Sequence, residues 1–181
     1  MYGLVNRAIE ELVLEQAGPA AWNQIRKRAQ LQIPGFVSMQ AYPDAITYAL
    51  VGAASQVLDI APSELLRAFG RHWILFTGRE GYGSLLEAAG QDLREFLLNL
   101  DALHARLGLS MPELVPPSFS VEEADGALRV EYRSTRVGLA PMVVGLLEGL
   151  GELFDEPVSV EHVQTRDEER HDVFVVRPKA P

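Results

Sequence analysis

The chain has 181 residues, enough for one domain or for two lobes around one site, and its 48% hydrophobic and 23% charged content is typical of a folded globular protein. A formal net charge of −9 without any basic run argues against nucleic acid and anionic membrane surfaces as partners. Cysteine is absent, which excludes disulfides, thiolate catalysis and thiolate-bound metals, so any metal must be held by His, carboxylate, Tyr or Met.

The N-terminal segment carries charges and lacks the apolar stretch of a signal peptide. No run of about 18 uninterrupted apolar residues occurs, which is the length that a membrane-spanning helix needs. We therefore expect a soluble, cytoplasmic protein with no membrane insertion.

Helices are predicted throughout the first part of the chain. Apolar residues at helical spacing predict helices over residues 5–17 and 19–29, separated by an Ala-Gly-Pro break, then over 43–58 and from Pro62 to about Phe76. The glycine-rich segment 77–83 is predicted to be a connection. It lacks the spacing and the Lys-Ser/Thr ending of a phosphate-binding loop, so we do not expect it to bind phosphate.

A leucine-lined helix is predicted over residues 91–108, with Gly108 as its stop. The three prolines in the next segment predict a stiff, extended connector over 111–119. His104 lies within the leucine stripe. It is either a core residue or a neutral ligand to an apolar planar cofactor, because no acid or second His accompanies it at the spacing of a zinc-binding helix.

The last third of the chain changes to strands. Alternating residues predict strands over 127–136, 158–163 and 172–177, the last two joined by a charged turn, with a helix over 140–154 after the first strand. Helices followed by a small, mainly antiparallel sheet with one inserted helix define an α+β fold.

Tyr132, Ser134 and Arg136 form a row of donors at the end of the strand predicted over 127–136. Because side chains alternate along a strand, the three point to one face and span about 13 Å. Such a row suits a ligand with two separated acid groups, since Arg binds a carboxylate with two parallel hydrogen bonds. The alternative is an edge strand that meets solvent. Together with His104, the row matches the needs of an iron porphyrin with two propionates.

At these residues the chain resembles the haem nitric oxide/oxygen-binding (H-NOX) domains, which are related to the haem domain of soluble guanylate cyclase. The matching stretches are MYGLVN at the start, NLDALHARLGLSMPELVPPSF around His104, the Tyr-x-Ser-x-Arg motif at Tyr132, Ser134 and Arg136, and GLAPMVVGLL after it. The motif alone is three common residues, but its spacing from His104 across a Pro-Pro connector is highly specific. The resemblance runs nearly end to end.

The resemblance implies one domain over residues 1–181, with a distal helical lobe over 1–63, a proximal lobe with the sheet over 64–181, and haem b buried between them. His104 would be the proximal iron ligand. Tyr132, Ser134 and Arg136 would bind the propionates. Pro117 would press on the porphyrin and distort it from planarity, although it also serves as a loop stiffener.

The distal side is expected to select the gas. Oxygen-binding members of the family place a tyrosine hydroxyl over the iron, whereas Met142 matches that position here. We therefore expect a sensor that binds nitric oxide and carbon monoxide and discriminates against oxygen. Trp73 is expected to approach the distal pocket, where its indole N–H is a donor; the alternative is a packing aromatic on its helix.

The expected output lies in a separate protein, a histidine kinase or a cyclic-di-GMP enzyme, and no catalysis is expected of this chain. A haem peroxidase would need a distal acid or base and a charge-stabilising group, which Met142 and Trp73 do not supply. The other alternative is a haem-free module that binds a dicarboxylate or another acidic ligand on the Tyr132 row, with His104 as a core residue.

Overall fold

The computed structural model describes residues 1–165 and 171–179, with the backbone alone for residues 77–82. Contacts divide the chain into two units, Met1–Phe69 and Gly70–Pro181. The division falls inside helix α3 (Pro62–His72). The lobes that we expect over 1–63 and 64–181 stay a prediction. Each unit is described by itself below.

The first unit is helical. Helix α1 (Gly3–Arg28) contains a non-helical residue, Gly18, with φ 78° and ψ 177°, directly before Pro19, so the chain breaks where the Ala-Gly-Pro segment predicted. Helix α2 (Asp44–Leu58) packs on α1. Their apolar faces and the start of α3 enclose a core that includes Val13, Ile25, Leu50 and Leu65.

No single described helix is long and apolar enough to cross a membrane. Among the described residues, one pair of helices, Asp44–Leu58 and Pro62–Phe76, has the length and composition of a membrane span when the two are counted together. The pair is bent by 112° at the break between the helices.

The helices of the second unit correct two predictions. A π-helix, η1 (Trp73–Thr77), follows α3, and helix α4 (Gly78–Glu87) occupies the segment that we predicted to be a glycine-rich connection. The predicted leucine-lined helix is two helices, α5 (Leu93–Leu98) and α6 (Leu100–Ser110). The chain turns between them at Asn99, whose side-chain amide donates to the carbonyl oxygen of Ala89 at 2.9 Å.

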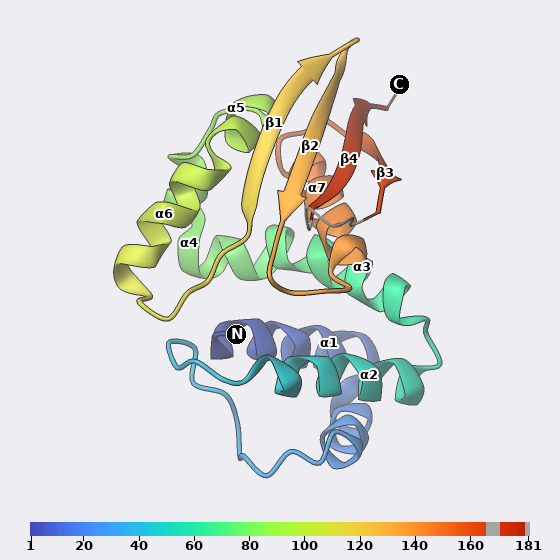
Figure 1. Cartoon of the computed structure of the whole chain (residues 1–181). Helices are drawn as coiled ribbons and strands as arrows, with labels where there is room; N and C mark the ends of the chain where they lie inside the picture. Colours follow the sequence, from blue (N-terminus) through green and yellow to red (C-terminus); the bar gives the residue numbers. More distant parts are fainter. Residues whose placement is uncertain (166–170, 180–181) are drawn as a thin grey trace. The chain divides into compact units, whose positions relative to one another are not determined.

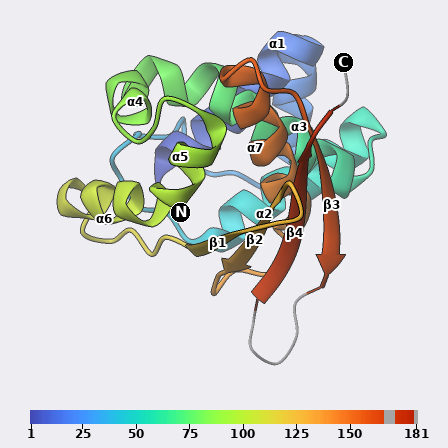
Figure 2. The same ribbon diagram turned by 90° about the horizontal axis from the view of Figure 1, so that it is seen from above.

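Four antiparallel strands form one sheet in the order β1-β2-β4-β3, as Figures 1 and 2 show. The strands are β1 (Ser118–Ala124), β2 (Ala127–Arg133), β3 (Val158–Gln164) and β4 (His171–Pro178). The α+β arrangement confirms the predicted fold class. Strand β1 was missed, because we assigned its first residues to the proline-rich connector.

Strand β2 ends at Arg133, so the prediction of a strand to residue 136 was wrong. Tyr132 lies in the strand, whereas Ser134 and Arg136 lie in the turn that follows it. The three residues are therefore not one straight row of alternating side chains.

Helix α7 (Ala140–Leu153) covers one face of the sheet, as both Figure 1 and Figure 2 show. Between helix and sheet lies a core that includes Phe96, Val130, Leu147 and Phe174. The face of α7 turned to α3 and η1 is very close to them: a Cβ on Gly149 would lie 3.1 Å from the carbonyl oxygen of Arg71.

Gly70 is expected to be intolerant of any side chain. A Cβ there would collide with the carbonyl oxygen of Met142 and lie 2.9 Å from the amide nitrogen of Leu146, so α3 and α7 would have to separate. Gly70→Ala should lower the free energy of unfolding by about 1–3 kcal/mol, the usual cost of overpacking. Urea denaturation measures the change.

Gly52, inside α2, provides the matched control because nothing lies within 4 Å of a Cβ placed there. Gly52→Ala should stabilise the protein by about 0.5–1 kcal/mol through helix propensity alone. Equal effects of the two substitutions would contradict the close approach of α3 and α7.

Candidate functional site

His104 lies on α6 with its ring half-buried. Its Nδ1 is buried and has no hydrogen-bond partner in the part of the chain that the structure describes. Burial lowers the pKa of the imidazole, and the nearby Asp101 carboxylate offsets this only in part. The ring is therefore held neutral, the form in which an imidazole nitrogen can donate its lone pair to a metal.

A row of ring contacts, the first stacked and the second tilted by 47°, leads from His104 to Tyr132. The His104 ring lies 5.8 Å from the Phe119 ring at 26° between planes, and the Phe119 ring lies 5.3 Å from that of Tyr132. Phe119 and Tyr132 are cross-strand partners on β1 and β2. We did not predict Phe119 as a site residue; it ends the stretch MPELVPPSF, and a strand assigned there would have revealed its partner.

Asp101 fixes α6 against β1. Its Oδ1 accepts a hydrogen bond from the backbone N–H of Phe119 at 2.7 Å. This N–H donates to Asp101 and points away from β2, and since β1 is the outer strand, it would otherwise have no strand partner. Asp101 stands one helical turn before His104, so the bond also sets the position of His104 relative to the sheet.

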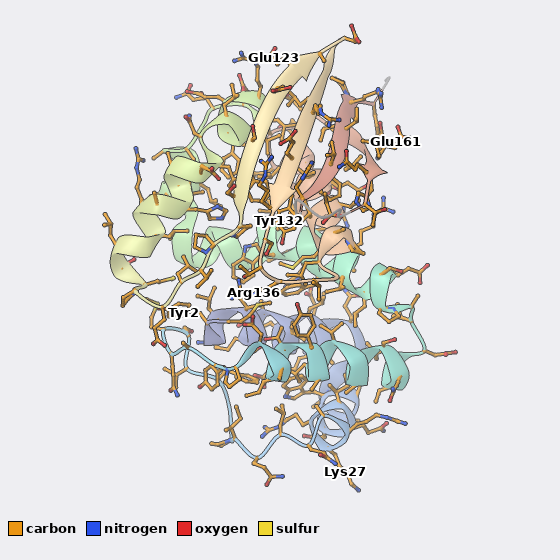
Figure 3. All side chains as sticks on the ribbon, viewed as in Figure 1. Tyr2, Lys27, Glu123, Tyr132, Arg136 and Glu161 are labelled. Carbon is orange, nitrogen blue, oxygen red and sulfur yellow. The ribbon has the colours of Figure 1, made fainter. Side chains whose placement is uncertain are left out.

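Arg136 and Ser134 form a turn that is tied to the proline-rich connector. The backbone N–H of Arg136 donates to Ser134 Oγ at 3.1 Å, and the Arg136 guanidinium donates to the carbonyl oxygen of Val115 at 2.8 Å. Figure 3 shows Tyr132 and Arg136 near one end of β2, with Glu123 toward the other end of the β1–β2 hairpin. The three residues of the motif thus stay close, although only Tyr132 is in the strand.

Pro117 is half-buried and directly precedes β1, two residues before Phe119. Through the bond from Arg136 to Val115, the connector that carries Pro117 is held to the turn after β2. The structure therefore brings the Pro117 segment, His104 and the Tyr-x-Ser-x-Arg motif together.

Met142 and Trp73 are positioned by another set of contacts, the crossing of α7 with α3 and η1. Met142 is in the first turn of α7, and its carbonyl oxygen faces Gly70, one turn before Trp73. Both side chains are half-buried. Trp73 is also the first residue of the π-helix, a distortion that is frequent at functional sites and that sequence patterns do not predict.

The donor set fits the haem that the resemblance implies. Among the side chains that the structure describes, those of residues 1–76, 83–165 and 171–179, no group of three or more His, Asp or Glu could hold a metal ion. A single neutral imidazole with an unpartnered buried nitrogen could hold the iron of a haem, whose porphyrin needs no further cluster of protein ligands. Tyr132, Ser134 and Arg136 supply a phenol, a hydroxyl and a guanidinium, all of which can donate to carboxylates.

A family model described as haem-NO-binding matches residues 2–162. Soluble guanylate cyclase gcy-35 from Caenorhabditis elegans is 33% identical over 180 residues, which are 97% of this chain and 26% of that protein. Guanylate cyclase soluble subunit beta-2 from Rattus norvegicus is 40% identical over 124 residues, which are 64% of this chain and 18% of that protein. The chain thus spans about a quarter or less of the length of these two relatives.

Solved structures have the same fold. An H-NOX protein from S. oneidensis in the Fe(II)NO ligation state superposes with a TM-score of 0.89 at 18% identity, covering 99% of this chain and 100% of that one. The Fe(II) unliganded H-NOX protein from K. algicida superposes with a TM-score of 0.86 at 20% identity, covering 100% of this chain and 98% of that one. At these identities the likeness establishes the fold.

Asp101→Ala should loosen the junction of α6 and β1. Without the carboxylate, the Phe119 N–H loses its acceptor at the sheet edge, and we expect a loss of about 1 kcal/mol in the free energy of unfolding. Hydrogen exchange at the Phe119 amide should accelerate at least about fivefold, the equivalent of that energy. Urea denaturation and amide exchange followed by NMR measure the two effects.

Asp101→Asn is the matched variant, because its side-chain oxygen can still accept the bond while the charge is gone. It should retain most of the protection of the Phe119 amide. If the alanine variant protects that amide as well as the wild type does, the bond does not hold β1 to α6.

Proposed function

The chain belongs to the haem-NO-binding family, and from this premise we propose that it is a gas sensor that carries haem b and binds nitric oxide and carbon monoxide. The observation that supports this most is the neutral, half-buried His104, joined by the Phe119 ring to Tyr132 of the Tyr-x-Ser-x-Arg motif. The S. oneidensis relative was solved with its Fe(II)NO and Fe(II)CO states, which agrees with this choice of gases.

In this proposal His104 would hold the haem iron through its imidazole. Partial burial lowers the pKa of the ring and keeps it neutral, so that no proton has to leave before the nitrogen binds metal. Asp101 holds the helix that carries it against the sheet through the Phe119 amide. If His104 and α6 move together, the hydrogen bond from the Phe119 amide to Asp101 would transmit that displacement to β1.

Tyr132, Ser134 and Arg136 would bind the two propionates. Arg136 is held by its bond to Val115, and the Ser134 hydroxyl by the Arg136 amide, so both groups are ordered in advance. Preordered donors lose less conformational entropy on binding. Pro117, on the connector held by Arg136, would press on the porphyrin and distort it from planarity.

The distal residues would be Met142 and Trp73. Ferrous haem, when bound, supplies an open coordination position for a diatomic gas. The Met142 thioether cannot donate a hydrogen bond, whereas oxygen needs such a donor more than nitric oxide or carbon monoxide does. We infer discrimination against oxygen on this basis, with the Trp73 indole N–H as the one donor proposed at that side.

The sensor would act in the cytoplasm on a separate protein, a histidine kinase or a cyclic-di-GMP enzyme, and would itself perform no catalysis. Movement of α6 away from its resting position would be the signal, because His104, Asp101 and the Phe119 amide form one mechanical link to the sheet. No nucleic acid is expected among the partners, given the net charge of −9.

Reduced protein should show a haem Soret band that shifts with nitric oxide, and His104→Gly should abolish haem binding unless imidazole is added. The vacated space then admits a free imidazole in place of the side chain. Absorption spectra at fixed haem stoichiometry give the result. His171→Gln, a substitution on a different element, is the control and should leave the spectrum unchanged.

A colourless wild-type protein that takes up no haem would refute the proposal and leave the haem-free module that binds a dicarboxylate. Rapid turnover of peroxide would instead revive the peroxidase alternative.

Met142→Tyr should raise the affinity for oxygen by about 10- to 100-fold, as expected for one added hydrogen bond of about 1.5–3 kcal/mol to a charged or strongly polarised acceptor. Met142→Phe, of similar size but without the hydroxyl, should not. Oxygen titration of the ferrous protein measures both. A comparable gain in the phenylalanine variant would show that pocket shape, and not a donor, governs oxygen binding.

A further inference from the structure

Phe119 of strand β1 contacts helix α6, which lies beside the strand (Figure 1), at two points. Its backbone N–H donates to Asp101 Oδ1 at 2.7 Å. Its ring stacks on the His104 imidazole, with 5.8 Å between the ring centroids and 26° between the planes. Asp101 and His104 are three residues apart, a spacing that puts both side chains on one face of a helix. One residue of the sheet thus contacts two positions on that face of α6.

Helix α6 is packed into the core less deeply than α5 is. Leu93, Phe96 and Leu97 of α5 are 3%, 1% and 1% exposed and belong to the core of the second unit. Of the 11 residues of α6, only Leu103 is buried. Because packing of an apolar face supplies most of what holds a helix in place in a protein, the contacts of α6 with β1 have more weight than such contacts would have for α5.

The Phe119 ring is itself backed by a buried ring. Phe119 is the register partner of Tyr132, and their ring centroids lie 5.3 Å apart at 47° between the planes. Tyr132 is 5% exposed and belongs to the same core. The Phe119 ring therefore contacts the core as well as the imidazole, and it gives the imidazole a surface that the sheet holds in place.

The plane of an imidazole matters for metal binding, because the lone pair of the ligating nitrogen lies in that plane. Metal-binding histidines commonly have the plane fixed by a hydrogen bond from the other ring nitrogen. For His104, the contact that the structure shows at the ring is the stack on Phe119. An aromatic surface nearly parallel to the imidazole also restricts its rotation about the Cβ–Cγ bond, since tilted arrangements would lose the contact.

We propose that Phe119 is the positioning residue of His104. Its ring sets the plane of the imidazole, and its amide, through Asp101, sets the position of α6 relative to β1. The inference rests on the proposed function, in which that imidazole holds the haem iron. Phe119 acts through His104, so strand β1 governs how the ligand ring is presented to the metal.

The first test needs no haem. In the haem-free protein with isotope-labelled histidine, the carbon-bound ring protons of His104 should have NMR signals shifted by the ring current of Phe119, and His104→Gly assigns these signals. Phe119→Leu should remove the shift, because leucine has no ring but keeps the backbone N–H that donates to Asp101. Phe119→Tyr should keep the shift. Equal His104 signals in the wild type and Phe119→Leu would overturn the inference, because another contact would then orient the ring.

The second test follows haem uptake by His104→Gly as free imidazole is added. The imidazole is then not attached to α6, so its apparent dissociation constant reports contacts with the ring alone. Adding Phe119→Leu should raise this constant about two- to tenfold, the contribution of one aromatic pair, whereas adding Phe119→Tyr should change it less than about twofold. An unchanged constant in the leucine variant would overturn the inference, since it would leave Phe119 a merely structural role.

Phe154→Leu is the matched control. Phe154 follows α7, is half-buried like Phe119, and has its ring 5.7 Å from that of Phe96. Its replacement removes an aromatic pair of the same kind and should leave the His104 signals and the imidazole constant unchanged. Changes as large as those in Phe119→Leu would overturn the inference, because they would follow from a general loosening of the core.

The two proposals fail in different ways. A wild type that takes up no haem would refute the proposed function, and the His104 signals of the haem-free protein would then decide by themselves whether Phe119 positions the ring. Haem uptake together with His104 signals that ignore Phe119→Leu would overturn the inference and leave the proposed function standing.

Discussion

The register between β1 and β2 is the constraint on which the candidate site depends. It opposes Phe119 to Tyr132, and so completes the row of ring contacts from His104. A slip of one residue would turn both rings to the other face of the sheet. The hairpin turn at Asp125 and Gly126, both at positive φ, fixes this register and lies at the opposite end of the strands. The site therefore depends on a turn that takes no part in its chemistry.

Sequence patterns predicted most of the helices, the α+β class and the segments that carry His104 and Tyr132, because hydrophobic periodicity and prolines are local signals. Strand β1 was missed because the prolines before it dominated the prediction, although Asp125-Gly126 is a strong hairpin signal. The break at Asn99 and the π-helix at Trp73 depend on tertiary contacts, which no local pattern contains. The roles of His104, Pro117 and Met142 came from family resemblance, and those roles remain predictions.

His104 and Asp172 are two polar side chains with little exposure to solvent, and their surroundings differ. His104 is kept neutral by its apolar surroundings. Asp172, on the same face of the sheet, retains a polar partner in His162. The same face of the sheet therefore carries both an apolar wall and a hydrogen-bonded polar pair.

Asp101 has an effect beyond placing His104. An outer strand presents unpaired N–H groups that can recruit a strand from another molecule. On β1, the N–H of Phe119 donates a hydrogen bond to the Asp101 carboxylate. Near the hairpin end, the Arg94 side chain of α5 donates one to the Glu123 carboxylate. Helices α5 and α6 thus cover part of the outer edge of the sheet, and a movement of α6 away from β1 would expose an N–H that can pair with a strand of another molecule.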